Sequence, residues 1–287
     1  MVEVVDGRVA VPWGDRSIEL AYRDWPGDGQ PIVLLHGLAS SSRIWDQVAA
    51  RLAPRWRVVA IDQRGHGRSD KPDDGYDFAT IVADDRAALA ALGVERPLLV
   101  GHSWGGNVAL QWAVEPGSEP RGLALVDGGF LEPARRMSWA QANERLRPPD
   151  LTMPLEQLRG RMRERLGARW SPAWEAATLA NFWVDGDGIV QRNLSIENHM
   201  KIVRALYEQS ASALFGRVPC PTLLIPADPP AEGGPPPEQR TAKAELIELA
   251  ERALGTRGRT VWMRETVHDM PLQRPAELAA LIAEAAA

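Results

Sequence analysis

The sequence predicts an α/β protein built on a mostly parallel sheet with helices on both faces. Seven short apolar runs alternate with longer amphipathic stretches for most of the 287 residues. The runs are SIELAY, PIVLLHG, WRVVAID, PLLVGH, GLALVDG, PTLLIPA and RTVWM, and helical patterns cover residues 44–52, 78–92, 103–114 and 242–254. Near-continuous apolar strands between helices are typical of parallel sheets that are buried on both faces. With 45% hydrophobic residues, the chain is long enough to bury a large core.

The first strands differ from the later ones. Through Tyr22 the sequence alternates apolar and polar residues more regularly than the later runs do. This alternation is typical of a strand with one solvated face, so we expect an antiparallel edge at the start of the sheet.

The alternation of strands and helices stops between residues 131 and 216. This stretch is rich in Arg, Leu and Trp at helical spacing, as in PLEQLRGRMRERL and NHMKIVRALYEQ, and has no strand-like run. We interpret it as a helical cap of residues 131–216 inserted into a core formed by residues 1–130 and 217–287. Tryptophan at helical spacing is more often packed in the interior than part of an aromatic pocket, and we expect this of the four tryptophans here. They are Trp139, Trp170, Trp174 and Trp183. The Pro/Gly-rich segment 228–240 is expected to be a loop.

Composition excludes several classes of protein. The formal net charge is −5 and the basic residues are scattered, which argues against nucleic-acid binding. No stretch approaches eighteen apolar residues and the start has no signal-like pattern, so we expect a cytoplasmic protein without a membrane partner. The single Cys220 cannot form an internal disulfide. Residues with metal-ligand spacing and the G-x-G-x-x-G fingerprint are absent, so we expect no metal and no cofactor.

A G-x-S-x-G motif follows the run PLLVG. It comprises Gly101, His102, Ser103, Trp104 and Gly105, and an apolar helical pattern follows it. Such a motif carries chemistry when a strand leads into a sharp turn and a helix leaves it, because the serine hydroxyl then stands exposed above the sheet. The flanking glycines leave room for this strained turn. This context favours a nucleophile over a simple helix cap at Ser103.

Together with three further segments, this motif makes the sequence resemble the α/β-hydrolase superfamily. PIVLLHGLASS resembles the family strand that ends in His-Gly, AIDQRGHGRSDKP resembles its Asp-x-x-Gly-x-Gly-x-Ser turn, and ETVHDMPLQRP places His268 where the family keeps its catalytic base. The resemblance implies an eight-stranded α/β-hydrolase fold with a cap after strand 6. It also implies an oxyanion hole formed by the backbone N–H groups of Leu38 and Trp104.

Serine at this position indicates attack on a carbonyl carbon. GHSWGG is similar to the GHDWGG turn of haloalkane dehalogenases and epoxide hydrolases, in which aspartate is the nucleophile. A hydroxyl needs a neighbouring base at neutral pH, and His268 would take the proton of Ser103 and return it to the leaving group. We therefore predict a serine hydrolase that acts on a small, apolar carboxylic ester or lactone. A C–C bond hydrolase of the meta-cleavage type and a ligand-binding member with slow turnover stay open as alternatives, as do monomer and homodimer.

The carboxylate that orients His268 has two candidate positions. The commoner family position follows the seventh strand, where alignment places Pro230, which cannot serve; Asp228 lies two residues too early, and Glu232 would need a rearranged loop. The other family position is the end of the sixth strand, which is occupied by Asp127. We favour Asp127 and keep Asp228 as the alternative acid.

The remaining histidines have ordinary structural interpretations. His36, His66 and His102 lie in turns beside the chemistry, where we expect them to serve as hydrogen-bonding scaffold. For His199, in the cap, we expect an exposed position on an amphipathic helix.

Overall fold

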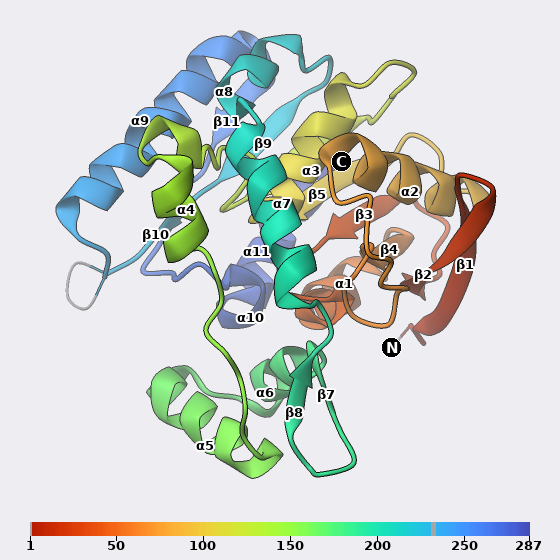
Figure 1. Ribbon diagram of the computed structural model, residues 1–287. Helices are drawn as coiled ribbons and strands as arrows, with labels where there is room; N and C mark the ends of the chain where they lie inside the picture. Colours follow the sequence, from red (N-terminus) through yellow and green to blue (C-terminus); the bar gives the residue numbers. More distant parts are fainter. Residues whose placement is uncertain (1, 231–233) are drawn as a thin grey trace.

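The predicted sheet is present. The structure, a computed structural model, describes residues 2–230 and 234–287, and within them the main sheet has eight strands in the order β1-β2-β4-β3-β5-β6-β9-β11 (Figure 1). The strands are β1 (Val5–Trp13), β2 (Arg16–Trp25), β3 (Ile32–Leu35), β4 (Val58–Asp62), β5 (Leu98–His102), β6 (Gly122–Val126), β9 (Thr222–Ile225) and β11 (Gly258–Thr260). The pairs β1–β2 and β2–β4 are antiparallel, whereas all later pairs are parallel. The predicted antiparallel edge is therefore confirmed.

Alternate residues of the central strands pack on opposite faces of the sheet. Val33 and Leu35 of β3 belong to one buried cluster, whereas Ile32 and Leu34 belong to the other. Helices α2 (Phe78–Ala91), α3 (Trp104–Val114) and α9 (Pro237–Leu254) cover the first face; α1 (Asp46–Leu52) and α11 (Pro275–Ala286) cover the second. Because both faces are covered, these strands are apolar throughout, as expected for a parallel sheet.

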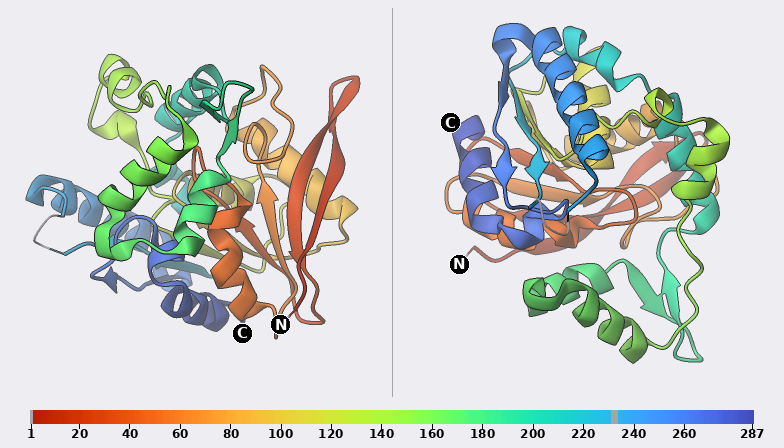
Figure 2. Two further views of the ribbon diagram at one scale, coloured as in Figure 1. Left: turned by 90° about the horizontal axis from the view of Figure 1, so that it is seen from below. Right: turned by 90° about the vertical axis from the view of Figure 1, so that its left-hand side faces the viewer.

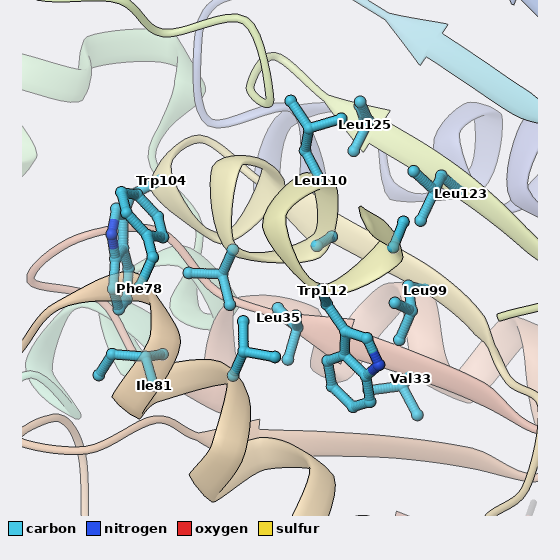
Figure 3. Close-up of a cluster of buried hydrophobic side chains, with 14 of the residues drawn as sticks. Val33, Leu35, Phe78, Ile81, Leu99, Trp104, Leu110, Trp112, Leu123 and Leu125 are labelled. Atoms are coloured by element: carbon cyan, nitrogen blue, oxygen red, sulfur yellow. The ribbon is translucent and has the colours of Figure 1, made fainter. Parts of the chain in front are cut away.

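Helix α3 is fixed to the sheet by large apolar side chains. Figure 3 shows the cluster, in which Trp104, Leu110 and Trp112 project from α3 among side chains of α2 and of strands β3, β5 and β6. Full burial of one such side chain is worth about 1.5–3 kcal/mol. The first residue of α3 is therefore held in place, and with it the turn between β5 and α3.

The insertion between β6 and β9 divides into two groups of elements (Figures 1 and 2). Helices α4 (Trp139–Arg145) and α7 (Ile196–Glu208) pack against each other beside the core. The second group contains α5 (Leu155–Leu166), α6 (Pro172–Leu179), β7 (Phe182–Val184) and β8 (Val190–Arg192), and its α6 contacts the 3-10 turn Ser42–Trp45.

The expectation that the insertion has no strands is wrong. Strands β7 and β8 form an antiparallel hairpin, and the carboxylate of Asp185 accepts hydrogen bonds from the backbone N–H groups of Asp187 and Ile189 in its turn. Gly188 has a φ of 77°, which glycine adopts without strain. The two Asp-Gly pairs in VDGDGIV were the overlooked turn signal.

Two expectations about cap side chains also need correction. His199 is buried rather than exposed, since α4 packs against its helix. Its Nε2–H donates to the backbone oxygen of Leu146 at 3.1 Å. Among the tryptophans, Trp174 is packed as expected, but Trp183 is 53% exposed on the hairpin.

Candidate active site

Ser103 occupies the sharp turn between β5 and α3. Its φ of 54° and ψ of −125° are sparsely populated for a residue with a side chain, and such strain is concentrated at functional sites. The turn is held by two hydrogen bonds: the Ser103 N–H donates to the oxygen of Val126 at 3.0 Å, and the Gly106 N–H donates to the oxygen of Ser103 at 2.9 Å. The side-chain hydroxyl makes no hydrogen bond to any described residue and is free to meet a ligand.

Glycines make this turn possible. A Cβ on Gly101 would lie 2.3 Å from the oxygen of Gly105, and one on Gly105 would lie 2.5 Å from the oxygen of His36. Both distances are too short for real contacts, so only glycine allows α3 to pack this closely on β3 and β5. The G-x-S-x-G spacing is therefore explained by close packing on both sides of Ser103.

Two backbone N–H groups lie unused beside Ser103. A Cβ on Gly37 would lie 3.0 Å from the Cβ of Ser103, so the turn that carries Leu38 is adjacent to the serine. The N–H groups of Leu38 and Trp104 have no partner in the part of the chain that the structure describes. Trp104 begins α3, where the first N–H groups have no partner inside the helix. Such free donors can stabilise negative charge on an oxygen.

His268 and Asp127 lie together at the ends of their segments. The Nδ1–H of His268 donates to Oδ2 of Asp127 at 2.7 Å, although the residues are 141 positions apart. The ring of His268 lies against the ring of His102, with centroids 4.7 Å apart, and the Nε2–H of His102 donates to the His268 backbone oxygen at 2.9 Å. Because His102 immediately precedes Ser103, this contact holds the His268 imidazole beside the serine turn.

Asp127 is buried and strained. It directly follows β6, has a φ of 43°, and is held by its N–H, which donates to the oxygen of Ile225 at 2.9 Å. Its Oδ1 accepts from the backbone N–H of Ala227 at 3.0 Å and forms an ion pair with Lys243 of α9. The two carboxylate oxygens therefore have different partners, and Oδ2 is left to His268.

The charges of the pair stabilise each other. Burial raises the pKa of Asp127, but the hydrogen bond and charge of His268, together with Lys243, outweigh it and hold this pKa well below its usual range. Desolvation lowers the pKa of His268, but the hydrogen bond and charge of Asp127 outweigh it and raise this pKa above 6.5. The aspartate is therefore ionised, and the histidine can accept a proton near neutral pH.

The alternative acid is not brought to His268. Asp228 lies in the short strand β10 (Ala227–Asp228), which pairs with β12 (Met263–Arg264), and its backbone oxygen accepts from the Thr266 N–H at 3.3 Å. Its carboxylate has no hydrogen bond or ion pair with any described residue. Glu232 lies outside the described residues.

The other histidines near the site support its turns. His36 Nε2 accepts from the Gln63 N–H at 3.1 Å, and His66 Nε2 accepts from the Ala39 N–H at 3.2 Å. Desolvation and the charge of His268 lower the pKa of His102 to about 4, so His102 is neutral at pH 7. These roles agree with the scaffold interpretation.

An apolar cavity of about 280 Å³ adjoins His268 and Asp127. Its apolar side chains are Phe130, Leu131, Pro133, Met137, Leu146 and Leu246. Charged and polar groups also contact it, namely Glu132, Arg136, Gln239 and Lys243. The cavity lies between the start of the insertion and α9, so the insertion contributes much of its wall.

Two other features are absent from the described ranges, 2–230 and 234–287. There, the His, Cys, Asp and Glu side chains form no group of three able to hold a metal ion. No helix in these ranges combines the length and apolarity that crossing a bilayer requires.

Comparison with known proteins identifies the class. The profile of the alpha/beta hydrolase fold family matches residues 30–224, which span β3 to β9. The chain therefore belongs to the α/β-hydrolase family, in agreement with the strand order and the turn at Ser103.

Individual relatives match parts of the chain or its fold. An uncharacterized protein of Mycobacterium tuberculosis is 33% identical over 201 residues, which cover 67% of this chain and 52% of the relative. A non-heme chloroperoxidase of Streptomyces lividans is 43% identical over 100 residues, or 33% of this chain and 36% of the relative. The chain thus spans about half, or less, of the length of these curated relatives.

Among solved structures, E-2-(acetamidomethylene)succinate hydrolase has a TM-score of 0.78 at 20% identity and covers 99% of both chains. The esterase of Exiguobacterium antarcticum has a TM-score of 0.71 at 19% identity and covers 96% of this chain and 98% of its own. At this identity, the two likenesses show a shared fold.

Sequence reasoning missed Lys243. Its partners Asp127 and Ala227 come from other elements, and Asp127 is 116 positions away, so no local pattern marks it. The one available signal was rarity, since the chain has only three lysines, Lys71, Lys201 and Lys243.

Proposed function

We propose that this protein is a serine hydrolase that cleaves a carboxylic ester or lactone through an acyl-enzyme on Ser103. One observation carries the proposal: the strained turn at Ser103 contacts, through the ring of the preceding His102, the imidazole of His268, whose Nδ1–H is bonded to the buried carboxylate of Asp127. Since Nδ1 carries that proton, Nε2 of His268 is the basic nitrogen. A base that is oriented by a third group is the recurring arrangement for activating a hydroxyl nucleophile.

In the proposed reaction, the Oγ of Ser103 attacks the carbonyl carbon while its proton passes to Nε2 of His268. The tetrahedral intermediate then collapses, the bond to the leaving oxygen breaks, and the imidazolium returns the proton to that oxygen. Water, deprotonated by the same nitrogen, attacks the acyl-enzyme and releases the acid and the free hydroxyl of Ser103. No hydrogen bond joins Ser103 and His268 in the described residues, and catalytic hydrogen bonds of this kind often tighten only when the substrate binds.

The negative charge of the intermediate is assigned to the N–H groups of Leu38 and Trp104. Both donors lie next to the serine and have no hydrogen-bond partner among the described residues. Because they are fixed by the two turns, they need no rearrangement when charge develops, and one such donor is worth about 2.7–4 kcal/mol of barrier.

The apolar cavity supports a small substrate with an apolar group. Its volume, about 280 Å³, lies at the lower end of ligand pockets, and its wall is mainly aliphatic and aromatic. We therefore expect short and medium acyl chains to be hydrolysed faster than long ones. The proposed chemistry requires no cofactor.

Hydrolysis of p-nitrophenyl esters from acetate to decanoate tests the proposal. The wild type should show turnover that peaks before decanoate, and Ser103→Ala should lower kcat by about 10⁶-fold, to the assay floor. Ser17→Ala, which changes an exposed serine of β2, is the matched control and should retain activity.

Two results would contradict the proposal. Turnover that survives in Ser103→Ala would exclude this serine as the nucleophile. A folded wild type that leaves every ester and lactone intact would exclude ester hydrolysis and favour a C–C bond substrate or a ligand-binding role.

A further inference from the structure

Lys243 joins α9 to the ends of two neighbouring strands. Its Nζ forms an ion pair with Oδ1 of Asp127, which follows β6, and donates to the backbone oxygen of Ala227 at 2.6 Å, just after β9. The Lys243 side chain is 23% exposed, so this contact is largely removed from solvent. Partly buried ion pairs of this kind are screened much less than surface pairs.

The contacts of Asp127 divide between its two oxygens. Oδ1 takes the ammonium of Lys243 and the N–H of Ala227, whereas Oδ2 takes only the N–H of His268. A carboxylate held at one oxygen by two donors from separate elements cannot turn freely. Its second oxygen is therefore directed at the imidazole.

We propose that Lys243 is a positioning residue of this site: it fixes the Asp127 carboxylate towards His268 and opposes the gain of positive charge on the imidazole. The inference rests on the proposed hydrolase function, because it assigns a task to Lys243 only where His268 works as a base. Lys243 acts through Asp127 and needs no contact with the reacting atoms.

The charges around His268 give the ammonium a definite effect. Asp127 faces the imidazole from the end of β6 and Asp269 from its own segment, and both favour the protonated form. Lys243 opposes it from α9, and His102, on β5, is neutral at pH 7. Two carboxylates without Lys243 would keep His268 protonated to a higher pH, and a protonated imidazole cannot take the serine proton.

The expected change is a shift of the acidic limb in the plot of kcat/KM against pH. Removal of the ammonium in Lys243→Met should move this limb to higher pH by about 0.5–1 unit, since a neighbouring charge shifts a pKa by this order. The freed carboxylate should also lower kcat at the optimum by about tenfold, with KM changed less. Lys243→Arg keeps the charge and should keep the limb near its wild-type position.

The experiment measures kcat/KM from pH 5 to 9 with the best p-nitrophenyl ester, followed at the isosbestic wavelength of the product. Lys201→Met removes an exposed lysine of α7 and is the matched control, which should leave the profile unchanged. If Lys243→Met does not fold, Lys243→Gln removes the same charge while it keeps a hydrogen-bond donor. If Lys243→Met or Lys243→Gln folds and its acidic limb lies at the same pH as that of the wild type, the inference is overturned, even if the stability of the variant is lower.

Ser103→Ala separates the two proposals. If this variant retains turnover, the serine-hydrolase proposal itself fails. If it is inactive while the uncharged Lys243 variant keeps the wild-type limb, only the role of Lys243 fails.

Discussion

The ends of β6 and β9 lie next to each other in the sheet, and each carries an aspartate after an apolar run. Asp127, at β6, is buried, has a φ of 43°, and gives its carboxylate to three partners. Asp228, in β10 just after β9, is half-buried in a regular strand, and its carboxylate has no partner among the described residues. Only the first of these carboxylates is built into the site.

The positions of β6 and β9 relative to β5 explain why Asp127, and not Asp228, belongs to the site. Strand β6 pairs directly with β5, which leads into Ser103, whereas β9 lies one strand further away. A Cβ on Gly128 would lie 2.0 Å from the oxygen of Ser103, so the turn after β6 packs on the serine itself. The end of β9 supplies support instead, since Ala227 binds both Asp127 and Lys243.

Exchange of each aspartate for asparagine tests which of the two carboxylates acts on His268, and it has the largest expected effect. Asp127→Asn should lower kcat by about 10⁴-fold, because an amide does not hold His268 in the tautomer that leaves Nε2 basic. Asp228→Asn should change kcat little. Both variants are measured with the same p-nitrophenyl ester and by circular dichroism to verify folding. The reverse pattern would assign the acid to the end of β9.

Much of this comparison could be predicted from the sequence. The strand and helix alternation predicted the sheet because strands buried on both faces must be apolar, and the glycines around Ser103 marked the turn because only they allow such close packing. The position of Asp127 followed from the resemblance to known relatives, not from local spacing. Its contact with His268 depends on chain segments 141 positions apart.

What the sequence could not provide depends on long-range packing. Lys243 lies on an amphipathic helix, where the rarity of lysine in this chain does not indicate a task, and its ion pair with Asp127, after β6, comes from long-range packing. His199 was expected at the surface because its helix is amphipathic, but α4 and the loop after it cover that face. The hairpin Phe182–Arg192 was overlooked because its strands are three residues long.

Gly128→Ala tests whether the end of β6 must pack on the serine turn. The added methyl meets backbone atoms of Ser103, which cannot move away, so the free energy of unfolding should fall by about 1–3 kcal/mol. Urea unfolding measures this, with activity as a second readout. Gly160→Ala, in α5, has open space at its Cβ and should be neutral or slightly stabilising. Equal stability of the two variants would show that the turn after β6 adapts freely.

A third aspartate, Asp85 of α2, adds a further case, because it is fully buried and neither oxygen of its carboxylate has a hydrogen-bond partner among the described residues. Burial, together with the charge of Asp84, raises the pKa of Asp85 well above its ordinary value. Asp127 is ionised because it is paired, whereas Asp85 is expected to be protonated in the folded protein.

Asp85→Asn should therefore change the pH dependence of stability. A folded-state pKa above the unfolded one favours folding fully at low pH, and this contribution is lost as pH rises towards the folded value. The neutral amide removes that loss, so the free energy of unfolding of the variant should rise relative to wild type from pH 5 to pH 8. Urea unfolding at both pH values measures it, with exposed Asp28→Asn as control. A gain that is the same at pH 5 and pH 8 would mean that Asp85 is not protonated on folding.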